Sequence, residues 1–119
     1  MEIKWIEYKG KNILLCDYRG AKSDKDMIDH INQFADMLRQ QTGRTLSLSN
    51  YENTVISTAF MVEAKKLGTE VGLVKMGKSA LLGVTGLKKI MLKSYNTITG
   101  QKDNRMFETE EEAKEWLVS

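Results

Sequence analysis

The residues best suited to chemistry are polar side chains that follow the predicted strands of an α/β sheet. In open sheets of this kind, ligands lie beyond the carboxyl ends of the strands. Those ends carry five hydrogen-bonding residues, namely Asp17, Ser49, Asn50, Tyr51 and Thr85. These residues can bind a ligand, but they include no paired acid and base and no activated nucleophile. The sequence therefore predicts a ligand-binding cleft and no enzymatic activity.

One stretch matches a phosphate-binding loop by spacing alone. The run Gly72-Leu-Val-Lys-Met-Gly77-Lys78-Ser79 satisfies the pattern GxxxxGK[ST]. Such a loop needs a helix that opens at its lysine, because the backbone amides of that helix surround the phosphates. The residues after Ser79 are Ala-Leu-Leu-Gly-Val, which predict a strand. We interpret the match as a coincidence and expect no nucleotide or other cofactor.

The chain has one histidine and one cysteine, and neither suggests a metal site. His30 has no second histidine to join it as a ligand, so we interpret it as a surface or helix-packing residue. Cys16 lies in the apolar run Asn12–Asp17, where a strand would bury it as a small hydrophobe. The alternative, a reactive thiol, is the less favoured interpretation. A lone cysteine cannot form a disulfide within one chain.

The composition is that of an ordinary globular protein. The 119 residues include 41% hydrophobic and 29% charged residues, which suits one domain spanning residues 1–119. No run approaches the ~20 apolar residues that cross a bilayer, so no transmembrane segment is predicted. The first residues alternate charged and apolar side chains, unlike a secretory signal. We therefore expect a cytoplasmic protein.

Apolar periodicity predicts the order of strands and helices. Residues 3–8 and 12–17 read as an antiparallel hairpin with Gly10 at its turn. Helices are expected from Ser23 to about Gln41, after Thr54 or Ser57, from Gly86 to Gly100 and from Thr109 onward, and strands at 44–49, 78–84 and 105–107. Residues 71–75 are a further candidate for extended structure.

Apolar residues within the two middle helices predict which sides face the core. They are Val55, Ile56, Ala59, Phe60, Val62 and Leu67 in the second helix, and Leu87, Ile90, Met91, Tyr95 and Ile98 in the third. Strands separated by single helices are most economically parallel. The predicted fold class is thus α/β, with a mixed sheet, an N-terminal antiparallel hairpin, mainly parallel remaining strands and about four helices.

Charge is unevenly distributed although the net charge is only +2. Residues 64–105 carry a net +7, and residues 108–115 carry a net −4. Lys88, Lys89 and Lys93 should form a basic surface on the third helix, which we interpret as a solvated face. The sharper alternative is contact with acidic lipid headgroups or an acidic partner helix. The aromatic residues are too dispersed for an RNA-binding sheet, so no nucleic-acid partner is expected.

The last forty residues resemble a known bacterial group. The segments Lys78-Ser-Ala-Leu-Leu-Gly-Val-Thr-Gly-Leu-Lys-Lys-Ile90 and Arg105-Met-Phe-Glu-Thr-Glu-Glu-Glu-Ala-Lys-Glu-Trp-Leu117 look like those of the SpoIIAA-like, or STAS/SEC14 domain-containing, proteins. The resemblance implies a STAS-like fold related to anti-sigma factor antagonists. Elsewhere it covers only the order of the elements.

The resemblance also implies a function and a modification site. Anti-sigma factor antagonists bind a protein partner and are switched by phosphorylation of a serine at a helix start, which corresponds to Ser57, with Thr58 beside it. The family signature Asp-Ser-Ser-Gly-Leu is absent, since this chain reads Ser49-Asn-Tyr-Glu-Asn-Thr-Val-Ile-Ser57. We expect a non-catalytic regulatory or scaffolding module with a protein partner or self-association. The alternative is a small-molecule or lipid-binding domain of the SEC14-like type.

Overall fold

A five-stranded sheet forms the centre of the molecule, and its strands follow one another in space in the order β1-β2-β3-β4-β5. The computed structural model describes residues 1–119. The strands are β1 (Glu2–Tyr8), β2 (Lys11–Asp17), β3 (Thr45–Asn50), β4 (Met76–Leu82) and β5 (Asn104–Phe107). The pair β1–β2 is antiparallel and every other neighbouring pair is parallel. The predicted α/β class, with a mixed sheet and an N-terminal hairpin at one edge, is confirmed.

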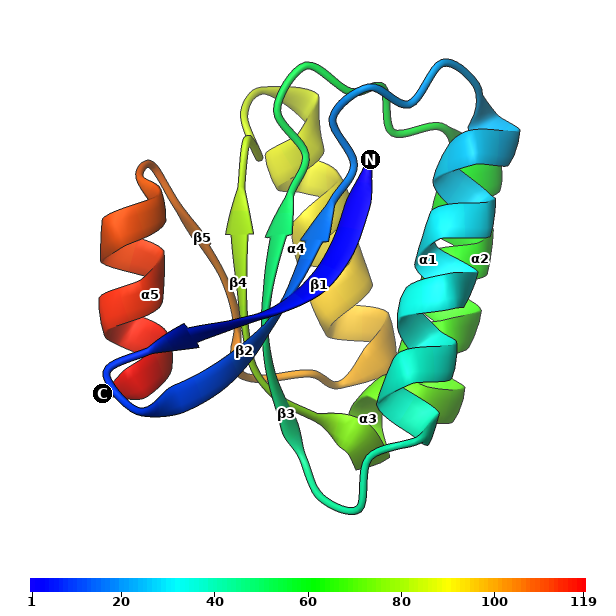
Figure 1. Cartoon of the computed structure of the whole chain (residues 1–119). Coiled ribbons are helices and arrows are strands. Elements are labelled where there is room, and N and C mark those ends of the chain that lie inside the picture. Colours follow the sequence, from blue (N-terminus) through cyan, green and yellow to red (C-terminus); the bar gives the residue numbers. More distant parts are fainter.

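Helices cover both faces of this sheet (Figure 1). They are α1 (Asp24–Arg39), α2 (Thr58–Leu67), α4 (Leu87–Thr99) and α5 (Glu110–Val118). Helices α1 and α2 pack on one face and α5 packs on the other. Between α2 and β4 the chain forms a π-helical turn, η1 (Gly68–Gly72), and a short turn, α3 (Leu73–Lys75). The extended structure predicted for residues 71–75 is therefore wrong, because η1 continues directly from α2.

Side-chain caps explain where three of these helices begin. Ser23, Ser57 and Thr109 are N-cap residues in extended conformation. Their hydroxyl oxygens accept hydrogen bonds from the backbone amides of residues 26, 60 and 112, at 3.1, 3.1 and 3.2 Å. Each bond satisfies an amide that has no partner inside its helix. The predicted helix starts at Ser23 and Thr109 are confirmed, and of the two alternatives for α2, Ser57 is the cap.

Two apolar clusters hold the layers together. The larger one joins the first face of the sheet to α1 and α2 and includes Leu14, Phe34 and Phe60. The smaller one joins the second face to Ala113 and Leu117 of α5. Trp116 is only half-buried, and its ring lies 5.3 Å from that of Phe107. Leu117, rather than Trp116, is the buried anchor of α5.

Helix α4 packs differently from the prediction. Met91 and Tyr95 face the sheet, whereas Leu87, Ile90 and Ile98 are exposed. Thr99 is the single buried residue of this helix. The predicted inward face is thus right at Met91 and Tyr95 and wrong at the other three positions, because the helix turns Lys88 rather than these aliphatic residues toward the sheet.

In α2 the prediction also fails at three positions. Val55 lies in the loop before the helix, and Ala59 and Val62 point outward, so all three side chains are exposed. Phe60, Ala64 and Leu67 carry the buried face. Helical spacing of apolar residues alone did not separate the buried residues from the exposed ones, because α2 has apolar residues on both sides.

A row of polar side chains crosses the sheet beneath α4. Ser47 on β3 pairs in register with Ser79 on β4, which in turn pairs with Asn104 on β5. All three residues are buried. Neighbouring positions Leu48, Ala80 and Leu82 point to the opposite face and pack against α5. The alternation of serine and leucine in β3 therefore places its polar side chains inside the protein.

The loops at the carboxyl ends of the parallel strands depend on close backbone approach. Gly83 follows β4 with a φ of +75°, a conformation that side chains other than glycine rarely adopt. A Cβ atom at this position would collide with the backbone of Glu52. This contact fixes the β3–α2 loop, which carries Tyr51, against the end of β4.

Candidate functional site

A cavity lies between the sheet and helices α1, α2 and α4. Its volume is about 90 Å³, and most of its lining residues are hydrophobic. An engineered apolar cavity of roughly 150 Å³ is large enough to bind benzene, and one water needs only about 10–15 Å³. The cavity can therefore hold several waters or a small organic group. Two acyl chains of a phospholipid would not fit in this conformation.

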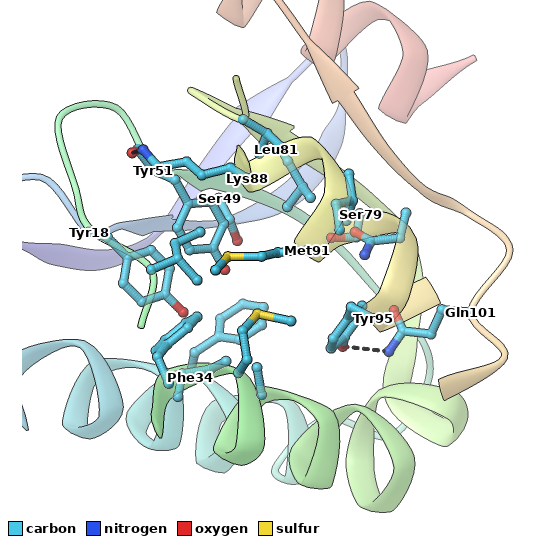
Figure 2. Close-up of a pocket in the computed structure, with 18 of the residues that line it drawn as sticks. Tyr18, Phe34, Ser49, Tyr51, Ser79, Leu81, Lys88, Met91, Tyr95 and Gln101 are labelled. Atoms are coloured by element: carbon cyan, nitrogen blue, oxygen red, sulfur yellow. Dashed lines mark hydrogen bonds between the residues drawn. The ribbon is translucent and has the colours of Figure 1, made fainter. Parts of the chain in front are cut away.

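Hydroxyl groups from β3, β4, α4 and the loops that follow β2 and β3 surround this space (Figure 2). They belong to Tyr18, Ser49, Tyr51, Ser79 and Tyr95. The Tyr95 hydroxyl accepts a hydrogen bond from Gln101 Nε2 at 2.8 Å, and the Ser79 hydroxyl accepts one from Ser47 Oγ at 3.2 Å. Each of these two hydroxyls keeps its own hydrogen for donation.

Burial keeps the phenol and thiol groups around the cavity uncharged. It raises the pKa of Tyr95 to about 12 and raises the pKa values of Tyr18 and Tyr51 well above their usual range. Burial also raises the pKa of the nearby Cys16 thiol to about 12. All four groups are protonated at neutral pH, so the wall offers neutral donors and acceptors.

Aromatic rings form one end of the cavity. The Tyr18 and Tyr51 rings stack with their centres 4.5 Å apart, and Phe60 meets Tyr18 edge-on at 5.7 Å. Methionines 61, 76 and 91 line the remaining apolar wall. Their flexible side chains fill irregular gaps and adapt to differently shaped groups.

Lys88 is the one charged residue that lines the cavity. Its ammonium group does not lie free, because it donates to the carbonyl oxygens of Tyr51 at 2.9 Å and of Gly83 at 3.4 Å. Burial lowers the pKa of this amine. The expectation that Lys88 points outward with Lys89 and Lys93 is wrong, since its alkyl chain closes the cavity at the carboxyl ends of β3 and β4 (Figure 2).

Gly68 and Gly72 in η1 allow the opposite wall to close. A Cβ atom at Gly68 would collide with the Tyr95 hydroxyl, and one at Gly72 would collide with the Gln101 amide. The absence of side chains at these positions brings α4 and the following loop close to η1. The Tyr95–Gln101 hydrogen bond lies where α4 and the loop after it contact η1.

The five residues predicted for the cleft separate into two groups. Ser49 and Tyr51 line the cavity. Asp17 instead accepts hydrogen bonds from Arg19 at 2.8–3.2 Å, and the Asn50 side-chain oxygen accepts one from the Glu52 amide at 2.9 Å. Thr85 is exposed and borders a separate surface groove. The structure therefore brings two of the five together.

Several cavity residues were not predicted as ligand contacts. They are Tyr18, Ser79, Tyr95, Gln101 and Asn104. A usable signal was present for Ser79, a hydroxyl-bearing residue inside the predicted strand 78–84. No comparable signal marks Gln101 or Asn104, because they follow a helix whose orientation the apolar pattern did not determine.

Ser57 and Thr58, the predicted phosphorylation sites, lie outside the cavity at the start of α2. The Ser57 hydroxyl is engaged as the N-cap, and Thr58 is exposed. Lys89 and Lys93 are exposed on α4. These positions agree with the expected geometry, and the modification itself stays a prediction.

The remaining motifs are placed in structural roles. Lys78 and Ser79 lie within β4, and Lys78 Nζ donates to the carbonyl oxygens of Trp116 and Ser119 at 2.9 Å. No helix opens at Lys78, so the phosphate-loop spacing is a coincidence.

His30 is buried and its Nε2 lies 3.1 Å from the Glu2 carbonyl oxygen. No three His, Cys, Asp or Glu residues are grouped as a metal site would require.

None of the helices combines the length and apolar character that crossing a bilayer requires. Comparisons with protein-family models, with curated proteins and with solved structures found no match to this chain. The resemblance to the SpoIIAA-like group stays a prediction.

Proposed function

We propose that this domain is a non-catalytic binding module that takes up a small, uncharged and mainly apolar molecule in the cavity beneath α4. The molecule would carry a hydroxyl or carbonyl group. The observation that carries the proposal is the cavity itself, which combines an aromatic and methionine wall with inward hydroxyls. Such a combination is typical of small-molecule sites.

The sparse packing of α4 supports an occupant. The cavity of about 90 Å³ is lined mostly by apolar side chains, which lack packing partners wherever the space is unfilled. Helix α4 spans 13 residues yet buries Thr99 alone. A bound molecule would supply the packing partners that the inner side of this helix lacks.

The charge state of the wall supports a neutral occupant. A buried carboxylate needs a partner that compensates for lost hydration. The Lys88 ammonium is already held by two carbonyl oxygens, and the phenols are protonated. Neutral hydroxyl or carbonyl groups match Ser79 and Tyr95 without that cost.

A protein-binding regulatory role and membership of the SpoIIAA-like group are two further hypotheses for this domain. The observed sheet and helix order is compatible with both. A ligand-binding cavity favours the small-molecule alternative over a module that acts through its surface alone.

Isothermal titration calorimetry with four probes tests the proposal. The neutral probes are benzyl alcohol and hexan-1-ol, and the charged probes are benzoate and hexanoate. We expect saturable binding of the neutral probes and at least ~10-fold weaker binding of the charged ones. Failure of both neutral probes to bind, or stronger binding of the carboxylates, would contradict the proposal.

A matched pair of variants localises the binding. Ser49→Leu places a larger apolar side chain in the cavity and should abolish binding, whereas Ser94→Leu makes the same change on α4 outside the cavity and should preserve it. Tyr95→Phe provides a second check that keeps the ring. It should weaken benzyl alcohol more than toluene, because only the alcohol uses the phenol hydroxyl.

A further inference from the structure

The outer side of α4 exposes large aliphatic side chains. Leu87, Ile90 and Ile98 are 66%, 67% and 59% exposed. Their spacing of three and eight residues places them along one side of the helix. Val62 of the adjacent α2 is also 66% exposed. Exposed aliphatic residues gathered along one helix indicate an interaction surface.

The same helix carries positive charge only. Residues 85–101 contain three lysines and no Asp or Glu. Lys89 and Lys93 are exposed, and neither takes part in any of the six ion pairs of the structure. Two carboxylates, Glu52 and Glu108, border the groove beside Lys89, so Lys93 is the more clearly uncompensated charge.

We propose that this outer surface of α4, formed by Leu87, Ile90, Lys93 and Ile98, docks on the surface of an anionic lipid bilayer. The helix would lie in the plane of the membrane, with its aliphatic residues at the level of the headgroups. Lysines beside an aliphatic stripe complement anionic headgroups. Each lysine that lies within a Debye length of the membrane surface contributes favourably to binding. The proposal is independent of the cavity ligand.

The composition of the surface favours a bilayer over a protein partner. Protein interfaces are enriched in aromatic residues, methionine and arginine, and they are depleted in lysine. The α4 surface instead combines leucine, isoleucine and lysine. That combination is typical of helices that lie at a membrane interface.

Charge also argues against a second copy as the occupant. A symmetric dimer through α4 would bring the Lys93 side chains of both copies to the same interface. The acidic helix α5 lies on the opposite face of the sheet, and its Glu115 already pairs with Lys9 (Figure 1). Contact between α4 and another copy's α5 would be head-to-tail, and such a contact closes only where the rotation between copies generates a ring.

Co-sedimentation with vesicles tests the docking surface. The probes are phosphatidylcholine vesicles with and without 30% phosphatidylglycerol, a fraction of about one third chosen to give a clearly negative surface. We expect binding to the anionic vesicles alone, with a marked loss on raising the salt from about 0.05 to 0.5 M.

Variants separate the apolar and electrostatic contributions. The double change Ile90→Gln and Ile98→Gln keeps the charge and a good helix former, and it should reduce vesicle binding about tenfold or more. Lys93→Glu should weaken binding to a similar degree, whereas Lys22→Glu makes the same charge change on the exposed loop between β2 and α1, outside this surface, and should have little effect.

Three outcomes would overturn the proposal. These are no binding of the unmodified protein to anionic vesicles, undiminished binding by the double glutamine variant, and equal loss in Lys93→Glu and Lys22→Glu. A solution dimer that the double glutamine variant abolishes, without vesicle binding, would assign the surface to a second copy. Because ligand uptake is measured without vesicles, failure here leaves the cavity proposal separately testable.

Discussion

At the scale of single residues, the most informative groups are buried polar side chains. Ser47, Ser79 and Asn104 occupy positions where a sheet normally presents apolar side chains to a covering helix. Asn104 Nδ2 donates to Asn96 Oδ1 at 2.9 Å, and Asn96 Nδ2 donates to the Asn104 carbonyl oxygen at 3.2 Å. This reciprocal pair ties α4 to β5, while Ser79 places its hydroxyl on the cavity wall.

His30 gives a prediction at the same scale. The residue is buried against the Tyr18 ring, at 4.9 Å between ring centres, and its Nε2 can only donate to the Glu2 carbonyl oxygen. Burial lowers the pKa of His30 below its usual value, and the positive N-terminus lowers it further. At neutral pH the folded protein therefore holds His30 in its neutral form.

The sign of the pH effect follows from proton binding. Below about pH 6.5 the unfolded chain takes up a proton that the folded protein resists, so stability falls as the pH falls from there toward the folded-state pKa. Urea unfolding at pH 7.5 and 5.5 should show this loss, and His30→Gln should show much less of it. Asp17 titrates at lower pH because Arg19 helps to lower its pKa. An equally pH-dependent His30→Gln variant would contradict the assignment.

At the scale of elements, the helix N-termini are well determined by the sequence, and the orientation of α4 is not. The hydroxyl-bearing caps at Ser23 and Thr109 are local features, so they could be identified without knowing the tertiary structure. Helix α4 carries apolar residues around most of its circumference. Which side faces inward is decided by Tyr95 and Lys88 contacts with η1 and the β3–α2 loop, and these lie far away in sequence.

The cap of α2 provides the prediction at this scale. Ser57→Ala removes the hydroxyl that accepts from the Phe60 amide and should lower the free energy of unfolding by ~0.5–2 kcal/mol. Ser57→Asp should retain most of the stability, since aspartate is an equally good cap and suits the positive end of the helix. Urea unfolding of the two variants measures the difference.

The same pair of variants addresses regulation. If Ser57 is a phosphorylation switch, peptides from protein isolated from its own cells should carry phosphate on Ser57 or Thr58. Ser57→Asp should then fold normally but capture less of its partner from a lysate than Ser57→Ala. Equal capture by both variants, with no such phosphopeptide, would exclude the switch. Greater stability of Ser57→Ala than of Ser57→Asp would contradict the role of Ser57 as the cap.

At the scale of the whole molecule, the sheet topology could be predicted and the cavity could not. Alternating strands and helices fixed the parallel part of the sheet, and the Lys9-Gly10 turn fixed the antiparallel edge. The cleft prediction placed all five residues near the carboxyl ends of the strands, but it could not assign them to one face. Asp17 and Asn50 fall on the face of α5, whereas Ser49 falls on the face of α4, because neighbouring strand residues alternate.

Two surfaces of α4 therefore carry the functional proposals. Its inner side covers the cavity with Met91 and Tyr95, and its outer side presents Ile90 and Ile98 to the surroundings. Gly86 and Gly100, at the two ends of the helix, both have positive φ values. The helix thus joins a candidate ligand site to a candidate membrane surface within one element.

Methionine methyl NMR tests the central claim, ligand binding in the cavity, most directly. Met61, Met76 and Met91 line the cavity, while Met27 lies elsewhere in the core and Met106 on the surface. With ¹³C-methyl-methionine protein titrated with benzyl alcohol, we predict saturable shifts of the first three signals, little change in Met27 and Met106, and loss of the response in Ser49→Leu. Absence of shifts at the three cavity methionines, or an equal response in Ser49→Leu, would contradict the account.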